Sequence, residues 1–296
     1  AMRTVIDLHM HSCYSDDGQY TPRELIAMCH ASGIQICALA DHNTTKGVEE
    51  AIQEAQKRGM RCIPAVEIDC TYQGVNLHVL GYGIDHHAAI FQQLEENVER
   101  QEQILGIKKL ELTNALGFSL CREQLDAICD NGVYTGELFA EVLLNDPRYR
   151  EHPLLEPYRP GGARGDNPYV NFYWDYYAQG KPCETVISYP SLTQVLAIIH
   201  QQQGIAVLAH PANNLKGNYA LLEEMIAIGI DGIECFSSYH KKAETDFFYE
   251  QAVLHHLAVT GGSDFHGKTK PAISLGDHNC TKEADVIEGL RKFHLI

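Results

Sequence analysis

Hydrophobic positions in the first third of the chain follow two alternating periods. The runs TVIDLHMH and IQICALADH are short, apolar and rich in β-branched residues, as buried strands are. The segments TPRELIAMCHASG and TTKGVEEAIQEAQKRG have helical spacing, and Thr21, Glu24 and Gly33 supply an N-cap, a capping box and a stop for the first helix. Two more strands are expected in RCIPAVEID and NLHVLGYG. This alternation predicts a parallel sheet or barrel.

The middle of the chain lacks strand signals. Residues 88–116 fit one long polar helix, and shorter helices are expected near 122–130 and 135–145. A loop rich in Pro and Gly follows at 156–168, and loops of this length are often functional or mobile. The aromatic run YVNFYWDYY after it has two interpretations, a helix that packs onto the barrel or a lid that stacks on a substrate ring. A solvated face is expected on the long helix at Glu95, Glu96, Glu99 and Arg100.

The strand and helix pattern returns near residue 186. Strands are expected in IAVLAHP, IDGIECF and LAVTGGSD, with helices between them. We therefore predict one α/β domain formed by residues 1–90 and 186–296, interrupted by a helical insertion at 91–185 that would act as a subdomain or lid.

Composition narrows the function classes. The net charge of −16 argues against docking of long nucleic acids on a basic face. The ten cysteines form no C-x-x-C pair, which indicates reduced thiols. Neither a secretory signal nor a run of 18 apolar residues is found, so a cytoplasmic protein without a membrane span is expected.

Metal-type ligands recur where the predicted strands end. Side chains two apart on a strand point to the same side, so His9 and His11 can converge on one cation, and Asp16 on the next loop can reach a neighbouring one. Asp17 is the alternative to Asp16. Barrel active sites lie at this end of the strands. The candidate metal ligands are His9, His11, Asp16, His42, Glu67, His78, His210, Asp264 and His266.

The number and type of these ligands indicate the cofactor. Nine groups exceed the needs of one ion and suffice for two or three divalent ions. Nitrogen and oxygen ligands without cysteine suit manganese, iron(II) or zinc. Ions a few ångströms apart can polarise a phosphoryl oxygen and supply hydroxide near neutral pH.

The motifs DLHMHS, ADH, VE, HVLGYG, AHP and GGSDFHG, in this order, resemble the PHP (polymerase and histidinol phosphatase) family. The resemblance implies a distorted (β/α)7 TIM-like barrel related to metal-dependent amidohydrolases. The insertion after HVLGYGID and the GKP near its end resemble the nucleotide- and phosphoester-cleaving branch. The implied ligand sets are His9, His11, Glu67 and Asp264 for one metal, Glu67, His78 and His210 for a second, and Asp16, His42 and His266 for a trinuclear site.

Two departures from the family pattern concern substrate binding. Ala40-Asp41-His42-Asn43 stands where relatives have Thr-Asp-His-Asp, and GVYTGELFAEVLL lacks the phosphate-gripping arginine of nucleotide-cleaving relatives. Arg148, Arg150, Arg159 and Arg164 are possible replacements. Glu234 is expected to pair with a neighbouring group inside the barrel, and Asp41 to orient an imidazole. The candidate substrate contacts are Lys181, Ser238, His240, Asn43 and Arg148.

The predicted function is a phosphoric ester hydrolase for a small phosphorylated metabolite, with nucleotides among the candidates. A hydroxide bridging the metals would attack phosphorus in line, oriented by Asp264, and His266 or His240 would protonate the leaving group. Lys181 would add positive charge at the phosphate. Two alternatives remain, a C–N hydrolase of the amidohydrolase type and a non-catalytic metal-dependent binding module. Glu67 at the bridging position, where amidohydrolases commonly carry a carboxylated lysine, disfavours the first.

Overall fold

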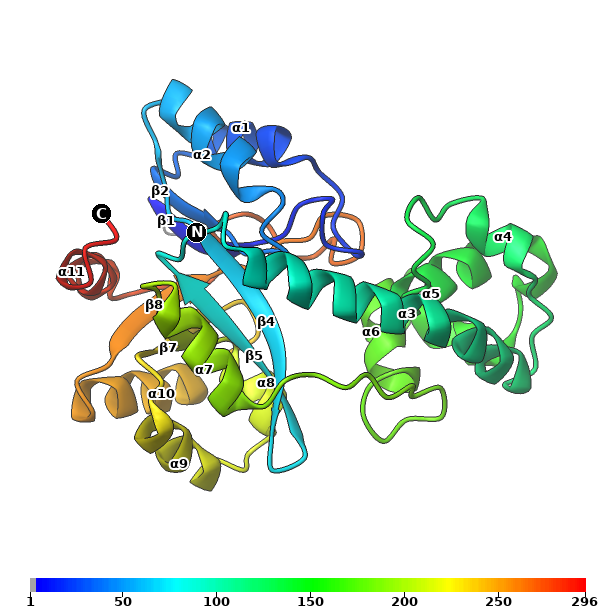
Figure 1. Cartoon of the computed structure of the whole chain (residues 1–296). Coiled ribbons are helices and arrows are strands. Elements are labelled where there is room, and N and C mark those ends of the chain that lie inside the picture. The colour runs from blue at the N-terminus through cyan, green and yellow to red at the C-terminus, as the bar shows by residue number, and fades with distance from the viewer. Residues whose placement is uncertain (1–3) are drawn as a thin grey trace.

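A computed structural model describes residues 4–296 and shows an α/β architecture with two sheets. In the first sheet the strands run parallel in the order β1-β2-β3, and two helices cover it (Figure 1). The predicted capping box is present, because Thr21 N donates to Glu24 Oε2 at 2.9 Å and Glu24 N donates to Thr21 Oγ1 at 3.2 Å. The elements are β1 (Ile6–Met10), α1 (Pro22–Ala31), β2 (Ile36–Leu39), α2 (Val48–Lys57) and β3 (Arg61–Cys62).

The second sheet has the order β4-β5-β6-β7-β8 and is mixed. Strands β6, β7 and β8 are parallel, but β5 is antiparallel to both of its neighbours, so the predicted parallel order is wrong there. The reason is the two-residue turn Gln73-Gly74, where both φ angles are positive (48° and 77°) as in tight hairpins. The strands are β4 (Ala65–Tyr72), β5 (Val75–Tyr82), β6 (Ile205–Leu208), β7 (Gly232–Ser237) and β8 (Ala258–Gly262).

Both edge strands of the second sheet, β4 and β8, lie next to strands of the first sheet. Isolated parallel bridges join Met10 to Phe265 and His42 to Glu67. A side chain on Gly262 would place its Cβ 2.2 Å from the Cβ of His9, so glycine is required for β8 to approach β1. The mixed α/β fold is confirmed, whereas a continuously closed (β/α)7 barrel stays a prediction.

Helices cover the outside of the second sheet (Figure 1). The strands contribute continuous apolar residues to one core, as strands buried on both faces do. None of the helices in residues 4–296 is long and apolar enough to cross a membrane. The covering helices are α7 (Leu192–Gln201), α8 (Pro211–Leu215), α9 (Ala220–Ile228), α10 (Lys242–Leu254) and α11 (Glu283–Lys292).

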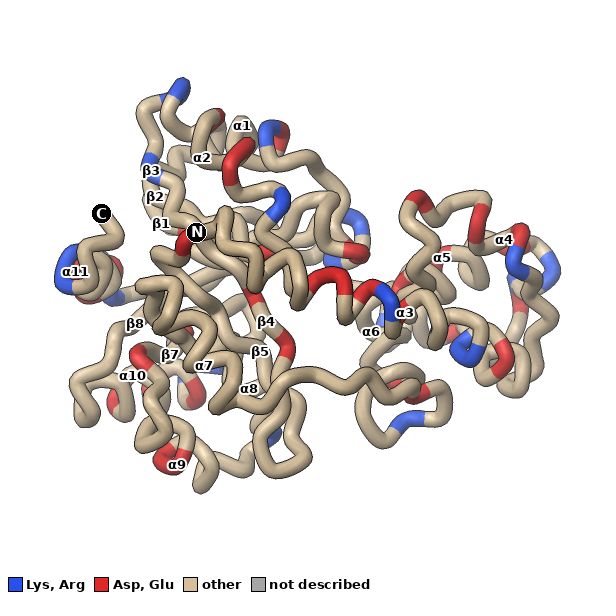
Figure 2. Tube along the Cα trace, in the orientation of Figure 1, with Lys and Arg blue, Asp and Glu red and all other residues tan. Residues whose placement is uncertain are grey.

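The middle of the chain extends away from the sheets as a helical insertion (Figure 1). It has a hydrophobic cluster of its own, with Phe139 and Phe172 fully buried. The predicted long helix is confirmed, and acidic positions follow it from the sheets toward the insertion (Figure 2). The domain boundaries stay a prediction. The elements are α3 (Ala89–Ala115), α4 (Arg122–Asp126), α5 (Gly136–Asn145), α6 (Pro168–Tyr176) and the 3₁₀ helices Pro147–Tyr149 and Pro153–Tyr158.

Candidate metal centre and active site

Four buried side chains converge beside the ends of β1 and β8. His9 Nε2 lies 3.2 Å from Glu67 Oε2 and 3.3 Å from Asp264 Oδ1. His11 Nε2 lies 3.1 Å and 2.9 Å from the same two oxygens. All four atoms are buried, and none forms a hydrogen bond with any residue in 4–296. Buried polar atoms are normally satisfied, so this set of two imidazole nitrogens and two carboxylate oxygens fits a divalent cation.

Glu67 connects this cluster to a second one. Its other oxygen, Oε1, lies 3.0 Å from His78 Nδ1 and 3.2 Å from His210 Nε2. His78 Nε2 in turn lies 2.8 Å from Asp69 Oδ1, because the β4–β5 register places Asp69 opposite His78. Glu67 is the third residue of β4 rather than its end, and its carboxylate faces two groups of imidazoles at once. Such a carboxylate can bridge two ions.

A third cluster contains His42 and His266, whose Nε2 atoms are 3.4 Å apart. Asp17, and not Asp16, faces them. Asp17 Oδ2 is 3.3 Å from His266 Nε2 and Asp17 Oδ1 is 3.8 Å from His42 Nε2. Asp16 Oδ1 instead accepts a hydrogen bond from Asn131 Nδ2 at 2.5 Å. The structure therefore places Asp17 where the sequence analysis expected Asp16.

Hydrogen bonds to the far side of the imidazole rings fix their orientation. His9 Nδ1 lies 2.8 Å from Glu234 Oε2, and His11 Nδ1 lies 3.0 Å from Ser15 Oγ. Ser15 Oγ also donates to Asp41 Oδ1 at 2.7 Å, so Asp41 acts on His11 through the serine. With Nδ1 engaged, Nε2 of each ring points into the cluster, an arrangement typical of histidine metal ligands.

The charges around the cluster favour a cation. Burial lowers the pKa of His11, but the nearby carboxylates of Asp264 and Glu67 outweigh this effect and raise this pKa to about 9. Burial raises the pKa of Glu67, but the imidazoles of His9, His78 and His42 hold this pKa well below its usual value. The carboxylates are thus ionised and require positive charge, which divalent ions supply while the imidazoles bind them in neutral form.

Lys270, which the sequence analysis did not single out, lies beside Asp264 together with Tyr239, which follows β7 and was expected on the active face. Lys270 Nζ is 2.7 Å from Asp264 Oδ2 and 2.6 Å from Tyr239 Oη, and Tyr239 Oη also donates to Asp264. Lys270 is buried, which lowers its pKa, but Asp264 and Asp17 reverse this and raise it. Lys270 therefore carries a full positive charge at the centre. Its signal in the sequence was the run KTKP directly after GGSDFHG.

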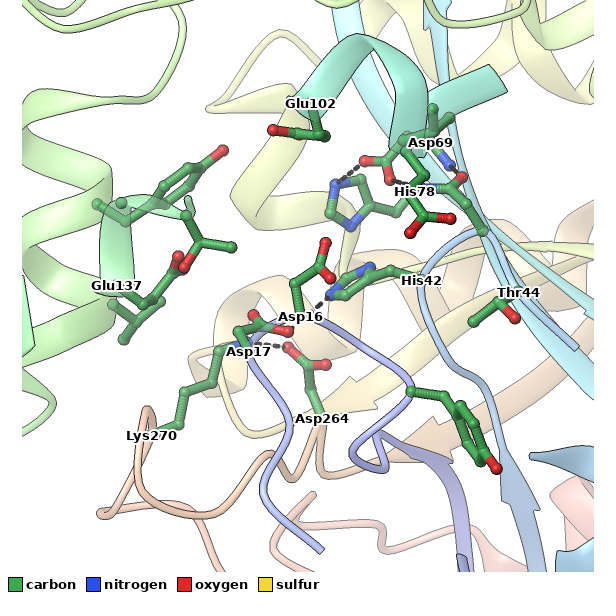
Figure 3. A pocket seen from close by; sticks show the side chains of 18 of the residues that line it. Asp16, Asp17, His42, Thr44, Asp69, His78, Glu102, Glu137, Asp264 and Lys270 are labelled. Atoms are coloured by element: carbon green, nitrogen blue, oxygen red, sulfur yellow. Dashed lines mark hydrogen bonds and ion pairs between the residues drawn. The ribbon is translucent and has the colours of Figure 1, made fainter. Parts of the chain in front are cut away.

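One cavity of about 330 Å³ lies between the strand ends and the insertion, and it is lined by Asp17, His42, His78, His210, Asp264 and Lys270. Figure 3 shows Asp17, His42, Asp264 and Lys270 facing this space, with Glu137 on the opposite side. Residues of α3, α5 and α6 complete its walls. The insertion thus forms part of the active-site cavity, as an insertion that contacts substrate would.

Four predicted substrate contacts do not reach this cavity. Lys181 is exposed on a loop, and Arg148 Nη2 binds Asp146 Oδ2 at 2.7 Å. Ser238 Oγ donates to the backbone oxygen of Ser263 at 2.8 Å. His240 packs into the fold, with Nδ1 2.9 Å from the backbone oxygen of Cys235. Among residues 4–296, none of these four contacts lines the cavity.

Asn43 does line the cavity, but its amide is already engaged. Its Nδ2 donates to Asp69 Oδ2 at 2.7 Å, and its Oδ1 accepts from Asp69 N at 3.0 Å. The structure gives Asn43 the task of positioning Asp69 beside His78. Asn43 also has a positive φ of 54°, a conformation that asparagine tolerates better than most residues.

Comparison with known proteins agrees with this geometry. The family model for the PHP domain matches residues 7–150. A 3′,5′-nucleoside bisphosphate phosphatase of Chromobacterium violaceum is 30% identical over 92% of this chain and 90% of its own. A phosphoribosyl 1,2-cyclic phosphate 1,2-diphosphodiesterase of Eggerthella lenta is 29% identical over 88% of this chain and 94% of its own.

A solved structure and further relatives extend the comparison. A structure from Bifidobacterium adolescentis, whose assignment as a metal-dependent phosphoesterase is itself a prediction, has a TM-score of 0.76 at 25% identity and covers 97% of this chain and 96% of its own. Other relatives include a 5′-3′ exoribonuclease of Escherichia coli. The fold and the convergent ligands define a metal-dependent phosphoesterase. The chain belongs to the PHP family.

Proposed function

We propose that this protein hydrolyses a small phosphorylated metabolite with two or three divalent ions, manganese, iron(II) or zinc, held at the strand ends. The observation that carries the proposal is the convergence of four buried atoms without hydrogen bonds, one each from His9, His11, Glu67 and Asp264. Free thiols at all ten cysteines support a reducing, cytoplasmic location as part of the same proposal.

The donor sets suit the ions in number and type. A first ion would be held by His9, His11, Glu67 and Asp264, and a second by Glu67, His78 and His210. A third would be held by Asp17, His42 and His266, because Asp17 faces both imidazoles. Bound ions would polarise the phosphoryl group and supply a hydroxide nucleophile near neutral pH.

The chain itself supplies positioning and charge. Lys270, held against Asp264 and Tyr239, would place a positive charge beside the reacting phosphate, the task the sequence analysis gave to Lys181. Asp264 Oδ2 accepts from Lys270, which leaves Oδ1 directed at the imidazoles of His9 and His11. His240 would take no part, since its ring is bonded to the backbone outside the cavity.

The test combines metal counting with phosphate release. Purified protein would be loaded with manganese, iron(II) or zinc and assayed with mononucleotides, 3′,5′-bisphosphorylated nucleosides, sugar phosphates, histidinol phosphate and a long RNA. We expect two to three ions per chain and phosphate release from a small ester. Long RNA should be a poor substrate, because the net charge of −16 opposes docking of a polyanion.

Two variants make this test specific. Asp264→Asn should lower phosphate release at least about 100-fold, because it removes a ligand and the partner of Lys270. Asp246→Asn, which alters an exposed ion pair with Lys242, is the matched control and should retain wild-type turnover. A metal-filled protein that is inert toward every ester, or an Asp264→Asn variant with full turnover, would contradict the proposal.

A further inference from the structure

The part of the cavity between α3 and the insertion, here called the outer subsite, is strongly acidic. Its carboxylates outnumber its lysines, and no arginine among residues 4–296 lines the cavity. Both lysines are already paired, since Lys109 Nζ lies 2.8 Å from Glu102 Oε2 and Lys46 forms an ion pair with Glu95. Glu95 and Glu99 thus line the cavity rather than forming the solvated face expected from the sequence. The remaining carboxylates are Glu99, Glu137 and Asp16.

Glu137 is the group that points to a ligand. It is the second residue of α5, is only 7% exposed, and faces the cavity from the insertion (Figure 3). Its carboxylate accepts a hydrogen bond from its own backbone N–H, but no side chain among residues 4–296 forms a hydrogen bond or ion pair with it. Because Glu137 is buried, an ionised carboxylate at this position is unfavourable without a positively charged partner. A cation bound beside it would remove that penalty.

The walls near Glu137 are aromatic. Tyr173 and Trp174 of α6 and Tyr189 line the same cavity. Gly136 brings α5 against α6 so closely that a Cβ there would lie 2.9 Å from Tyr173 Cδ2. Aromatic faces attract cations through the ring quadrupole, most strongly where water is excluded. A buried carboxylate with aromatic neighbours therefore suits an organic ammonium group.

We infer that the outer subsite selects phosphate esters whose leaving group carries a protonated amine, and that it disfavours substrates with a second phosphate. The inference rests on the proposed function, because Lys270 and the metal ligands must hold the reacting phosphate at the inner end. A second phosphate would face Glu99, Glu137 and Asp16 with no free cation among the described cavity residues to receive it. The ammonium group would face the same carboxylates favourably.

Three aryl phosphates test this selectivity directly. They carry an aminomethyl, a hydroxymethyl or a phosphonomethyl group para to the phosphate, and the methylene keeps the leaving phenolates similar. We expect kcat/KM for the ammonium ester to exceed that of the hydroxymethyl ester by about tenfold. The phosphonomethyl ester should be the poorest substrate. The reverse order, or equal rates for all three, would overturn the inference.

Variants of α5 assign the selectivity to one carboxylate. Glu137→Gln should bring the ammonium to hydroxymethyl ratio close to one, and Glu137→Arg should make the phosphonomethyl ester the better substrate. Glu141→Gln is the matched control, because Glu141 lies one turn further along α5, outside this cavity, where it binds Lys268 at 3.0 Å. Glu141→Gln should keep the wild-type ratio. An unchanged ratio in Glu137→Gln would contradict the inference.

Binding of the product alcohols separates this inference from the proposed function. Calorimetry should show 4-(aminomethyl)phenol binding about tenfold more tightly than 4-(hydroxymethyl)phenol to the metal-loaded protein, and Glu137→Gln should remove the difference. If no ester is hydrolysed but this preference is observed, only the proposed reaction fails. If esters are hydrolysed without any such preference, only the outer subsite has been misassigned.

Discussion

Carboxylates that contact the candidate metal ligands determine the orientation of the imidazole rings. Glu234 is fully buried on β7 and serves two ligands at once. Its Oε2 lies 2.8 Å from His9 Nδ1, and its Oε1 accepts from His210 N at 2.9 Å. This second bond helps to hold His210 at a φ of 23°, a strained value for a residue other than glycine. Glu234 is therefore a positioning residue that acts on two proposed ions through His9 and His210.

Replacing this carboxylate should weaken metal binding without removing a ligand. Glu234→Gln keeps the shape but loses the charge that orients and polarises His9, so we expect about 10- to 100-fold weaker affinity for the divalent ions. Competition titration with a metal-sensitive dye measures the change. Glu224→Gln on the exposed side of α9 serves as the control and should bind metal normally. Wild-type affinity in Glu234→Gln would show that the contact with His9 has no part in ion binding.

At the scale of residues, the sequence indicated which residue types form the site more reliably than which residues contact one another in it. The spacing of His9 and His11 requires that both imidazoles lie on one side of β1, so their convergence was predictable. The choice between Asp16 and Asp17 was not, because loop conformation decides it and Asn131 of the distant insertion binds Asp16. Lys270 was missed for a similar reason, since only the folded loop brings it to Asp264.

At the scale of elements, the insertion is held by polar contacts at its helix ends as well as by its core. Asp146 follows α5 and accepts from Arg148 N at 3.0 Å, which begins the next 3₁₀ helix. Its Oδ2 accepts from Arg148 Nη2 at 2.7 Å and from Gln124 Nε2 of α4 at 3.0 Å. One carboxylate thus connects α4, α5 and the following turn. This is the role the structure gives Arg148 instead of substrate binding.

Because of the junction at Asp146, the free energy of unfolding should depend on pH in the acidic range. Hydrogen bonds from Arg148 lower the pKa of Asp146 to about 2, below its value in an unfolded chain, so its contribution is present above about pH 4 and lost as pH falls toward 2. Because Arg148 is half exposed, Asp146→Asn should cost only about 1 kcal/mol at pH 7. Urea unfolding of both proteins at pH 7 and pH 3 measures it. The difference should shrink at pH 3, and a constant difference would refute the ionic origin.

The sequence largely predicted which segments form helices and strands, but it did not predict how the strands pair. The capping box of α1 and the length of α3 are local features that neighbouring residues encode. The reversal of β5 depended on Gln73 and Gly74, a turn that alternation of strands and helices does not reveal. The consequence is large, because only an antiparallel β5 places His78 opposite Asp69 and within 3.0 Å of Glu67.

At the scale of the whole molecule, the candidate centre joins segments far apart in the chain. His9 comes from β1 and His11 from the position directly after it, Glu67 comes from β4, and Asp264 comes from the loop after β8. Both sheets contribute, and they otherwise meet through isolated bridges near the same place. Ions bound here would therefore connect the two sheets at a place where only isolated bridges join their backbones. Ion binding and stability of the fold should be coupled.

Removing the ions should consequently lower the stability of the entire protein. Ions that bind only the folded state at about 1,000 times their dissociation constant stabilise it by about 4 kcal/mol. For a chain of this size, that corresponds to roughly 5–10 °C in melting temperature. Calorimetry before and after chelation, with manganese or zinc added back, measures the shift. Asp264→Asn should lose most of this shift in melting temperature, because the variant lacks a ligand that follows β8 and faces His9 and His11. Asp146→Asn should retain the shift, because the junction in the insertion is separate from the ions. If the melting temperature does not change on chelation, then His9, His11, Glu67 and Asp264 do not bind a cation that connects the two sheets.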